Sequence, residues 1–343
     1  MRTKRLLGVV AMMAGIALVA CGCDDGTDSD EHICWDDGLI APVDAAPGLH
    51  WQPRAAVGGG AIQEDAVAAV DGKVYVIGGF TGGGQIVDAV RVYDPATDTW
   101  SDAAPLPMAV HHANAAAIGD TLYVLGALTG IGFEPIASAW SYSPATDSWT
   151  DLAPLPVARG SAAIGVIDGK IYVAGGLGAT GATAAAAVYD PATDTWTAIP
   201  PISMARDHLV GAVVDGIFYA IGGRNVDPAA ITGRVDAYDP ATGVWSPRAA
   251  MLTPRGGTAA GVIGSRIYVA GGEGNADDPS GVFPQTEIYD PARDTWTPGP
   301  AMLTPRHGTG GAVIANILYV PGGADVQNFG AVDTHEALVM ATR

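Results

Sequence analysis

The chain has 343 residues, of which 48% are hydrophobic and 15% are charged, and its formal net charge is −19 at pH 7. The hydrophobic fraction is ample for a buried core, and the negative charge excludes nucleic acid as a favoured partner because it repels phosphate. With 47 glycines and 24 prolines separating short β-branched runs, the composition favours an all-β architecture.

The first twenty residues have the organisation of a secretory signal. The basic segment MRTKR precedes a fifteen-residue apolar run at 6–20, which is short for a membrane-spanning helix of about 20 residues. The run ends in Leu-Val-Ala before Cys21, which resembles the lipobox of bacterial lipoproteins. The resemblance implies cleavage before Cys21 and a lipid anchor on it. It therefore implies a lipoprotein of the bacterial cell envelope, on the periplasmic or the outer side of the outer membrane; an ordinary cleaved signal is the alternative.

Residues 21–47 are expected to form a flexible acidic linker, because eight Asp and Glu residues lie between positions 24 and 44. Cys23 and Cys34 are the remaining cysteines. In an oxidising compartment they can form a disulfide, and two free thiols are the alternative.

The rest of the chain, residues 48–343, repeats one pattern about every 50 residues. The octapeptide YDPATDTW at 93–100 returns unchanged at 189–196 and in close copies at 142–149, 238–245 and 289–296. The Tyr and Trp positions are Tyr93, Trp100, Tyr142, Trp149, Tyr189, Trp196, Tyr238, Trp245, Tyr289 and Trp296, and Trp51 precedes them all without a Tyr. Glycine doublets follow the same period at Gly78-Gly79, Gly175-Gly176, Gly222-Gly223, Gly271-Gly272 and Gly322-Gly323.

This order of a glycine doublet, a Tyr and a Trp at a period near 50 resembles the Kelch repeat. The resemblance implies a six-bladed Kelch-type β-propeller, with four antiparallel strands A to D in each blade. The blades are expected at about 57–104, 105–153, 154–201, 202–250, 251–301 and 302–343, the last completed by 48–56. The final glycine doublet has no Trp after it, so the segment around Trp51 is predicted to supply the missing strand D and close the ring.

The octapeptide itself is interpreted as structural. Its Tyr and Trp are expected to be buried, with the Trp packing between neighbouring blades, and its Asp-Pro begins a turn. In a meander the C–D turn lies on the face opposite the B–C and D–A loops. Function is therefore expected on the B–C/D–A face, where the loops differ between units.

Four arginines recur at one position of the D–A loops: Arg159, Arg206, Arg255 and Arg306. They are predicted either to form a partial positive collar around the channel mouth that attracts an anion, or to bond to carbonyls of neighbouring blades or to Asp residues and hold the ring. Glu64, His112, His208 and His307 lie close to this position in the repeat and are further candidates for ligand binding. Adjacent strand residues face opposite ways, so His111 and His112 are not expected to bind one metal. No catalytic residue, metal or cofactor is assigned.

The sequence thus predicts a monomeric, membrane-anchored extracytoplasmic protein that binds a protein or a glycan through the B–C/D–A face. One alternative is a sugar-active enzyme resembling the periplasmic sialic-acid mutarotases, with Glu64, Glu134 or Glu273 as its acid. A structural element of the envelope is another. Copper radical chemistry of the galactose-oxidase type is disfavoured, because it needs a Cys in the propeller and all cysteines precede residue 35.

Overall fold

The computed structural model describes residues 48–341. The predicted signal peptide, the acidic linker and Cys21, Cys23 and Cys34 lie outside the described residues. Within the described part of the chain, no helix has the length and apolar character needed to cross a membrane.

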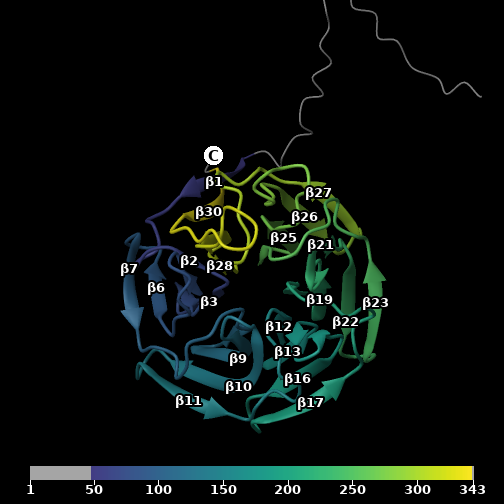
Figure 1. Cartoon of the computed structure of the whole chain (residues 1–343). Coiled ribbons are helices and arrows are strands. Elements are labelled where there is room, and N and C mark those ends of the chain that lie inside the picture. Colours follow the sequence, from purple (N-terminus) through teal and green to yellow (C-terminus); the bar gives the residue numbers. More distant parts are fainter. Residues whose placement is uncertain (1–47, 342–343) are drawn as a thin grey trace, which may run out of the picture. The chain divides into compact units, whose positions relative to one another are not determined.

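Six four-stranded antiparallel sheets surround a central axis as the blades of a propeller, which confirms the predicted fold (Figure 1). Blade 1 is β3 (Ala66–Val70), β4 (Lys73–Ile77), β6 (Val90–Asp94) and β7 (Thr99–Ala103); blade 2 is β8 (Ala115–Ile118), β9 (Thr121–Thr129), β10 (Glu134–Ser143) and β11 (Ser148–Leu152). Blade 3 is β12 (Ala163–Ile167), β13 (Lys170–Ala174), β16 (Ala186–Asp190) and β17 (Thr195–Ile199); blade 4 is β18 (Val210–Val214), β19 (Ile217–Ile221), β22 (Val235–Asp239) and β23 (Val244–Arg248). Blade 5 is β24 (Ala259–Ile263), β25 (Arg266–Ala270), β26 (Thr286–Asp290) and β27 (Thr295–Pro298).

The last blade closes the ring with strands from both ends of the described chain. It contains β28 (Ala312–Ile314), β29 (Ile317–Pro321), β30 (His335–Met340) and, as its outermost strand, β1 (Leu49–Pro53). β1 is antiparallel to β30, with Trp51 opposite Leu338. The predicted composite blade is therefore confirmed.

Short strands of the B–C and D–A loops pair on the face that carries these loops. They are β2 (Ile62–Gln63) with β5 (Phe80–Thr81), β14 (Leu177–Gly178) with β15 (Gly181–Ala182), and β20 (Arg224–Asn225) with β21 (Asp227–Ile231). The pairing of β2 with β5 joins the D–A loop to the B–C loop of one blade.

The core consists of six hydrophobic clusters, one at each junction between neighbouring blades. Strand B of each blade contributes most, because the β-branched and aromatic side chains of segments such as KVYVI at β4 are buried on both faces. The Asp-Gly turns between strands A and B adopt positive φ at both residues, 49° at Asp71 and 70° at Gly72, as a type I′ hairpin requires.

The glycine doublet at the end of strand B brings two blades together. A Cβ on Gly78 would lie 2.5 Å from the carbonyl oxygen of Val110, and one on Gly79 would lie 2.6 Å from that of Gln63. Gly79 N–H donates to Val110 O at 2.8 Å, which links blade 1 to the start of blade 2. No other residue type fits so close a backbone contact at positive φ.

The octapeptide fastens the outer edges of neighbouring units. The Tyr93 hydroxyl donates to Asp98 Oδ1 at 2.6 Å, and the same oxygen accepts the N–H of Ala55 at 3.0 Å. The Trp100 indole N–H donates to Ala55 O at 3.0 Å. The six Trp are less uniformly buried than predicted: only Trp51 and Trp296 are fully buried, and Trp100, Trp149, Trp196 and Trp245 are half-buried.

Candidate functional site

One residue from each D–A loop adopts a left-handed conformation, and together these six residues form a ring around the propeller axis. This axial ring consists of Glu64, His112, Ser161, His208, Gly257 and Gly308, with φ between 51° and 66°. Five of the six backbone N–H groups donate to the carbonyl of the preceding ring residue, for example His112 N–H to Glu64 O at 2.7 Å. The N–H of His208 instead donates to Ser161 Oγ at 3.1 Å.

The axial ring divides the channel into two environments. On one side lies a channel of about 500 Å³ lined mainly by Ala, Gly and Val of the innermost strands. On the loop side lies a small polar chamber of about 50 Å³. Glycine at ring position 308 provides room for a carboxylate, because a Cβ there would lie 2.6 Å from Oε1 of Glu64. The ring therefore presents its polar side chains to the mouth.

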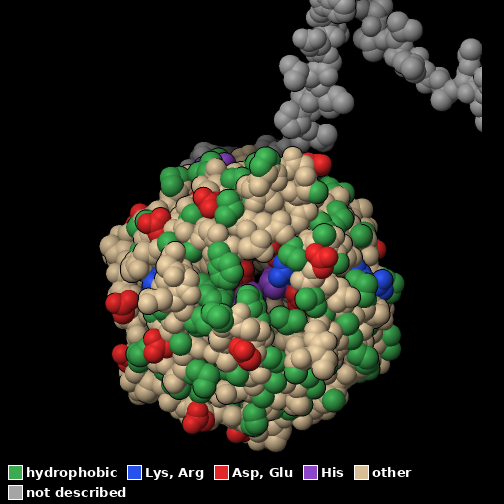
Figure 2. Space-filling view, viewed as in Figure 1, with side chains coloured by type: hydrophobic (Ala, Val, Ile, Leu, Met, Phe, Trp, Pro, Cys, Tyr) green, Lys and Arg blue, Asp and Glu red, His purple; other side chains and the backbone are tan. Residues whose placement is uncertain are grey.

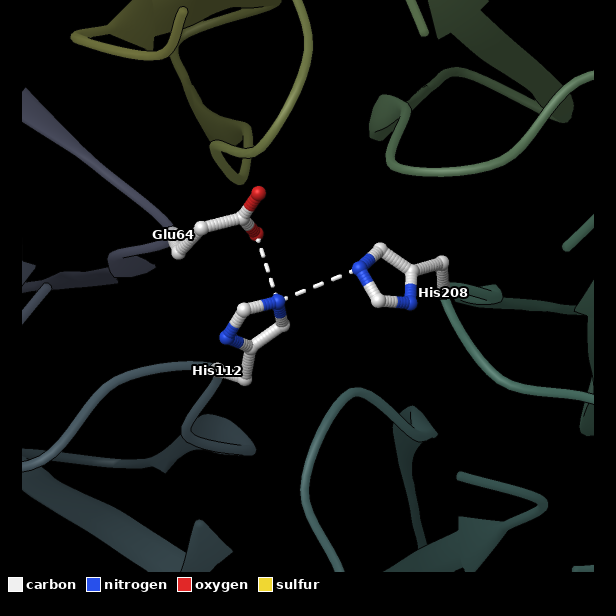
Figure 3. Close-up of side chains that lie close together, drawn as sticks. All are labelled: Glu64, His112 and His208. Atoms are coloured by element: carbon white, nitrogen blue, oxygen red, sulfur yellow. Dashed lines mark hydrogen bonds and ion pairs between the residues drawn. The ribbon is translucent and has the colours of Figure 1, made fainter. Parts of the chain in front are cut away.

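Three ring side chains converge in the chamber (Figure 3). Glu64 Oε2 lies 2.9 Å from His112 Nε2, and His112 Nε2 lies 3.1 Å from His208 Nε2. The three residues come from blades 1, 2 and 4 and are all buried. We refer to Glu64, His112 and His208 as the mouth triad.

The residues just before the two ring histidines hold those histidines in place. His111 Nε2 donates to Gly130 O at 3.0 Å, and His111 Nδ1 lies 2.6 Å from His112 Nδ1. In the same way, His208 Nδ1 donates to Asp207 Oδ1 at 2.6 Å. Each triad histidine thus has a partner on Nδ1 and presents Nε2 to the chamber.

Two residues that directly follow glycine doublets complete the polar wall. Arg224 donates to His208 Nε2 at 3.0 Å and to Asp207 Oδ1 at 3.3 Å, and it forms an ion pair with Glu273. His307 Nδ1 is 3.7 Å from Oε1 of Glu64 and 3.7 Å from Oε2 of Glu273. The chamber therefore holds charged groups of both signs.

Burial and these neighbours shift the proton affinities of the cluster. Burial raises the pKa of Glu64, but His112 and the other histidines outweigh it and hold that pKa well below its usual range. Burial and the Arg224 guanidinium lower the pKa of His208. Burial and His112 lower the pKa of His111 to about 4. At neutral pH, Glu64 is therefore a carboxylate, and His111 and His208 are neutral.

The chamber opens outward into a bowl of about 650 Å³ built by the B–C loops. Both spaces are lined by Phe133, His208, Arg224 and Asn328. Figure 2 shows this face: a hollow at the centre exposes histidine and basic side chains at its floor, and hydrophobic side chains surround it. Phe329 is 59% exposed and forms an edge-on contact with buried Phe80, which fixes an aromatic surface at the rim.

The four recurrent arginines do not line the mouth, which corrects the interpretation of these residues as an open collar. Arg159, Arg206, Arg255 and Arg306 are all at most 1% exposed. Each guanidinium donates to the carbonyl of a strand-B residue of its own blade. Three also pair with a strand-C carboxylate: Arg206 with Asp236, Arg255 with Glu287 and Arg306 with Glu336.

Arg159 has no such carboxylate, since Ala187 occupies the corresponding strand-C position, and burial lowers its pKa to about 10. The arginines therefore have a structural role, as the alternative expected, but their partners lie in their own blades and not in neighbouring ones.

The other predicted candidates meet in one place. Glu64, His112, His208 and His307 all line the chamber, together with Glu273. Glu134 lies in the bowl wall. Arg224 was missed by sequence reasoning. Its place in the repeat could have identified it. The residue after a glycine doublet forms an antiparallel β-bridge with the residue before the axial ring, as Arg224 does with Asp207 and Glu273 does with Gly256.

Comparison with known proteins agrees with the repeat pattern. The family model described as "KLHDC2/KLHL20/DRC7 Kelch-repeats domain" matches residues 64–272, which is more than half of the chain, and the Kelch motif model matches residues 254–303. Among curated proteins, the chain is 42% identical over 64 residues to Kelch-like protein terF of Aspergillus terreus, which covers 19% of this chain and 14% of that protein. It is 35% identical over 82 residues to mouse Kelch-like protein 35, which covers 23% of this chain and 14% of that protein.

The matched segments are a small part of these relatives, so they support the repeat and not the activity of the whole proteins. The solved structure of YjhT superposes with a TM-score of 0.70 at 18% identity, and the match covers 83% of this chain and 97% of that one. At this identity, the likeness supports the fold alone.

Proposed function

This chain belongs to the Kelch-repeat family, and we propose that it is a binding protein, attached to a bacterial envelope through Cys21, that recognises a protein partner through its B–C/D–A face. Kelch propellers present one loop face around a closed ring, and such a fold suits protein binding. The lipid anchor rests on the resemblance of the segment before Cys21 to a lipobox. The ligand class rests on the surface of the described residues.

The distribution of exposed hydrophobic side chains supports this face. Of the eleven most exposed large hydrophobic residues, nine lie in B–C or D–A loops: Met108, Ile131, Val157, Met204, Val226, Leu252, Leu303, Val326 and Phe329. The other two are Val244, at the start of β23, and Met340, at the end of β30, both on the opposite face, where the C–D turns lie. Apolar surface gathered on one face is typical of protein–protein contact. This asymmetry is the observation that carries the proposal.

A photocrosslinking experiment on the full chain in envelope preparations tests the proposal. A photoreactive phenylalanine analogue replaces Leu252 or Phe329 on the loop face, and Val244 serves as the control because its exposure of 53% matches the 55% of Leu252. We expect one protein to be crosslinked from the two loop positions and not from position 244. The same protein should bind the double variant Leu252→Ser/Phe329→Ser at least about tenfold more weakly and bind Val244→Ser unchanged.

Two results would contradict a protein partner. Equal crosslinking from all three positions would show nonspecific contact. Binding on a glycan array that depends on Phe133, in the bowl, and not on Leu252 would make the ligand a carbohydrate held in the bowl.

A second candidate is a sugar-active enzyme, and the contact of Glu64 with His112 supports it. A carboxylate 2.9 Å from an imidazole, beneath a bowl large enough for a sugar, is an arrangement used in acid–base catalysis. Glu64→Gln should then abolish turnover of a sugar substrate and leave crosslinking from position 252 unchanged. If Glu64→Gln turns over the substrate at the wild-type rate, Glu64 is not the catalytic group.

A further inference from the structure

We propose that the mouth triad binds a divalent first-row transition metal ion. One ligand atom from each of Glu64, His112 and His208 lies within 4.8 Å of the others, and Figure 3 shows the three side chains pointing toward one another from three separate blades. Two imidazole nitrogens and one carboxylate form a ligand set used for zinc and for nonhaem iron. This inference is independent of the protein partner proposed above.

The hydrogen bonds behind His112 determine which of its nitrogens is free. A carbonyl can only accept, so His111 Nε2 must donate to Gly130 O, and Nδ1 of neutral His111 is then an acceptor. His112 Nδ1, at 2.6 Å, must donate to it. In the form that binds a metal, with Nδ1 protonated and Nε2 deprotonated, His112 therefore directs its Nε2 lone pair toward Glu64 and His208.

The hydrogen bonds around His208 lead to the same result. Its Nδ1 donates to the carboxylate of Asp207, and Arg224 donates to its Nε2 at 3.0 Å. Nε2 of His208 therefore accepts the hydrogen bond from Arg224. The same lone pair can bind a metal ion when the guanidinium moves away. A carboxylate behind a ligating histidine is the usual outer partner in metal sites, where it fixes the ring and raises its basicity.

The triad therefore brings three electron-pair donors into close contact. The Nε2 atoms of His112 and His208 are 3.1 Å apart, and Glu64 Oε2 is 2.9 Å from Nε2 of His112. Bond lengths of about 2.0–2.2 Å to zinc place its ligand atoms roughly 3.3 Å apart in a tetrahedron. Two of the three separations are close to this value, and the third, between Glu64 and His208, is at most 4.8 Å, so a single metal ion can draw all three donors together by side-chain adjustment.

The charge of the surrounding wall also suits a divalent cation. Three carboxylates, those of Glu64, Asp207 and Glu273, are buried around the chamber and face one guanidinium, that of Arg224. In this wall the carboxylates outnumber the guanidinium by two. Buried carboxylates are unfavourable unless they are compensated by positive charge, and a divalent cation is a species that supplies it.

His307 is an independent pointer to the same site. Its Nε2 donates to Val326 O at 3.1 Å, so Nδ1 is an acceptor when the ring is neutral. That Nδ1 is buried, has no hydrogen-bond partner among the described residues, and lies 3.7 Å from a carboxylate oxygen of both Glu64 and Glu273. A buried nitrogen without a partner that faces two carboxylates marks a place for a positively charged species, either a proton on His307 or a metal ion close to it.

The proposed ion would keep a side open to a ligand. The triad supplies three ligands from the floor of the chamber, whose remaining wall includes the rings of Phe133 and Phe329. Three protein ligands with a free position are typical of metal sites that bind or activate a further molecule, whereas structural sites are closed by four.

Titration of the chelator-treated full chain with Zn²⁺ by calorimetry, and with Co²⁺ by absorption, tests the proposal. We expect one site per chain that disappears in His112→Ala/His208→Ala and in the isosteric Glu64→Gln. The Co²⁺ d–d absorption band should disappear in the same variants. A triad that only stabilises the fold would not produce this band. Asp207→Asn should weaken Zn²⁺ binding by about 10–100-fold. Arg224→Gln should strengthen it, because a competing positive charge is removed.

His50→Ala is the control, because His50 lies in β1, the outermost strand of the last blade, and does not line the chamber. We expect its Zn²⁺ binding to equal that of the wild type. Any ion held by the acidic segment before residue 48 would survive in the double variant and is thereby distinguished. Wild-type protein that binds no Zn²⁺ or Co²⁺ at micromolar concentrations would overturn the proposal. So would a folded double variant, verified by its thermal melt, that binds with unchanged stoichiometry and affinity.

Discussion

The two faces of the propeller use the same repeat in opposite ways. On the C–D side, the octapeptide is nearly identical from blade to blade, and in four of its five copies the Tyr hydroxyl donates to the Asp at the end of the turn, as at Tyr93 and Tyr189. On the loop side, the axial ring keeps one backbone conformation while its side chains change from Glu64 to His112 to Gly257. Repeated side chains thus stabilise the scaffold, and side chains that vary on a repeated backbone create the candidate site.

The largest expected effect concerns ring closure at a repeated position. Trp51→Ala should lower the free energy of unfolding by about 3–5 kcal/mol for the cavity, with about 1 kcal/mol more for the indole hydrogen bonds to Thr286 and Pro300. Trp245→Ala should cost less, because Trp245 is only half-buried. Denaturant unfolding measures both, and equal losses would show that β1 contributes no more than an ordinary strand D.

The next largest effect is expected at the recurrent arginines, and it tests whether they stabilise the scaffold or serve the mouth. Glu287→Leu leaves the Arg255 guanidinium buried without its carboxylate and should cost about 3–5 kcal/mol. The double variant Arg255→Met/Glu287→Leu should recover most of that loss. Arg159→Met, which breaks no ion pair, should be close to neutral.

These arginine variants also separate the two faces functionally. Zn²⁺ affinity and crosslinking from position 252 should be unchanged in every folded arginine variant. If Arg159→Met lost either of them, Arg159 would have a role in the mouth that its buried position does not explain.

The arginines and the triad illustrate what the sequence could and could not predict. The period of Trp and glycine doublets predicted the blade number and the closure by β1, because those residues act through packing that is the same in every unit. The arginine collar was wrong because the decisive partner lies elsewhere in the repeat, two residues before the strand-C Tyr. Asp236 and Glu287 occupy that position, so the acidic partners were visible in the sequence.

The triad could be predicted only in part. Glu64, His112 and His208 were each identified as mouth candidates from their place in the repeat. Their meeting depends on the left-handed backbone of the axial ring and on Nδ1 partners such as His111, which redirect the rings toward the axis. No short motif encodes this, because the three residues come from three blades.

His335, which lies away from the mouth, allows the stability of the scaffold to be tested as a function of pH. His335, in strand C of the closing blade, is 2% exposed and packs edge-on against Tyr93, and its Nδ1 lies 3.2 Å from Ala55 O. Burial lowers the pKa of His335 to about 4; Ala55 O and Asp98 oppose this shift, and Arg306 and Arg54 add to it.

Because the folded pKa of His335 is below the unfolded value of about 6.5, its neutral form stabilises the fold above pH 6.5, and this stability is lost as the pH falls toward 4. From the shift, the loss at pH 5 is about 2 kcal/mol. The free energy of unfolding of the wild type and of His335→Phe is measured at pH 7.5 and pH 5. The loss due to His335 is the difference between the two proteins in how much this free energy falls. An equal fall in both proteins would contradict a buried neutral His335.

The smallest effect tests the octapeptide by its one natural exception. Blade 4 has Gly243 where the other copies have Asp, so the described Tyr238 hydroxyl has no carboxylate partner, and a Cβ at 243 would lie 3.9 Å from it. Tyr93→Phe should therefore cost about 1 kcal/mol, whereas Tyr238→Phe should cost almost nothing. Thermal or denaturant unfolding of the two variants gives the difference directly.

The exception can also be reversed. The Asp residues at the equivalent position have φ near 50°, as at Asp98 and Asp194, and Gly243 has φ 68°. Gly243→Asp is thus compatible with the backbone, since Asp tolerates this left-handed region better than most residues. It should add the missing bond to Tyr238 and raise the free energy of unfolding by about 0.5–1 kcal/mol. That gain should vanish in Gly243→Asp/Tyr238→Phe. A gain that persists there would come from the loss of glycine and not from the hydroxyl–carboxylate bond, and the octapeptide would then stabilise through its Trp alone.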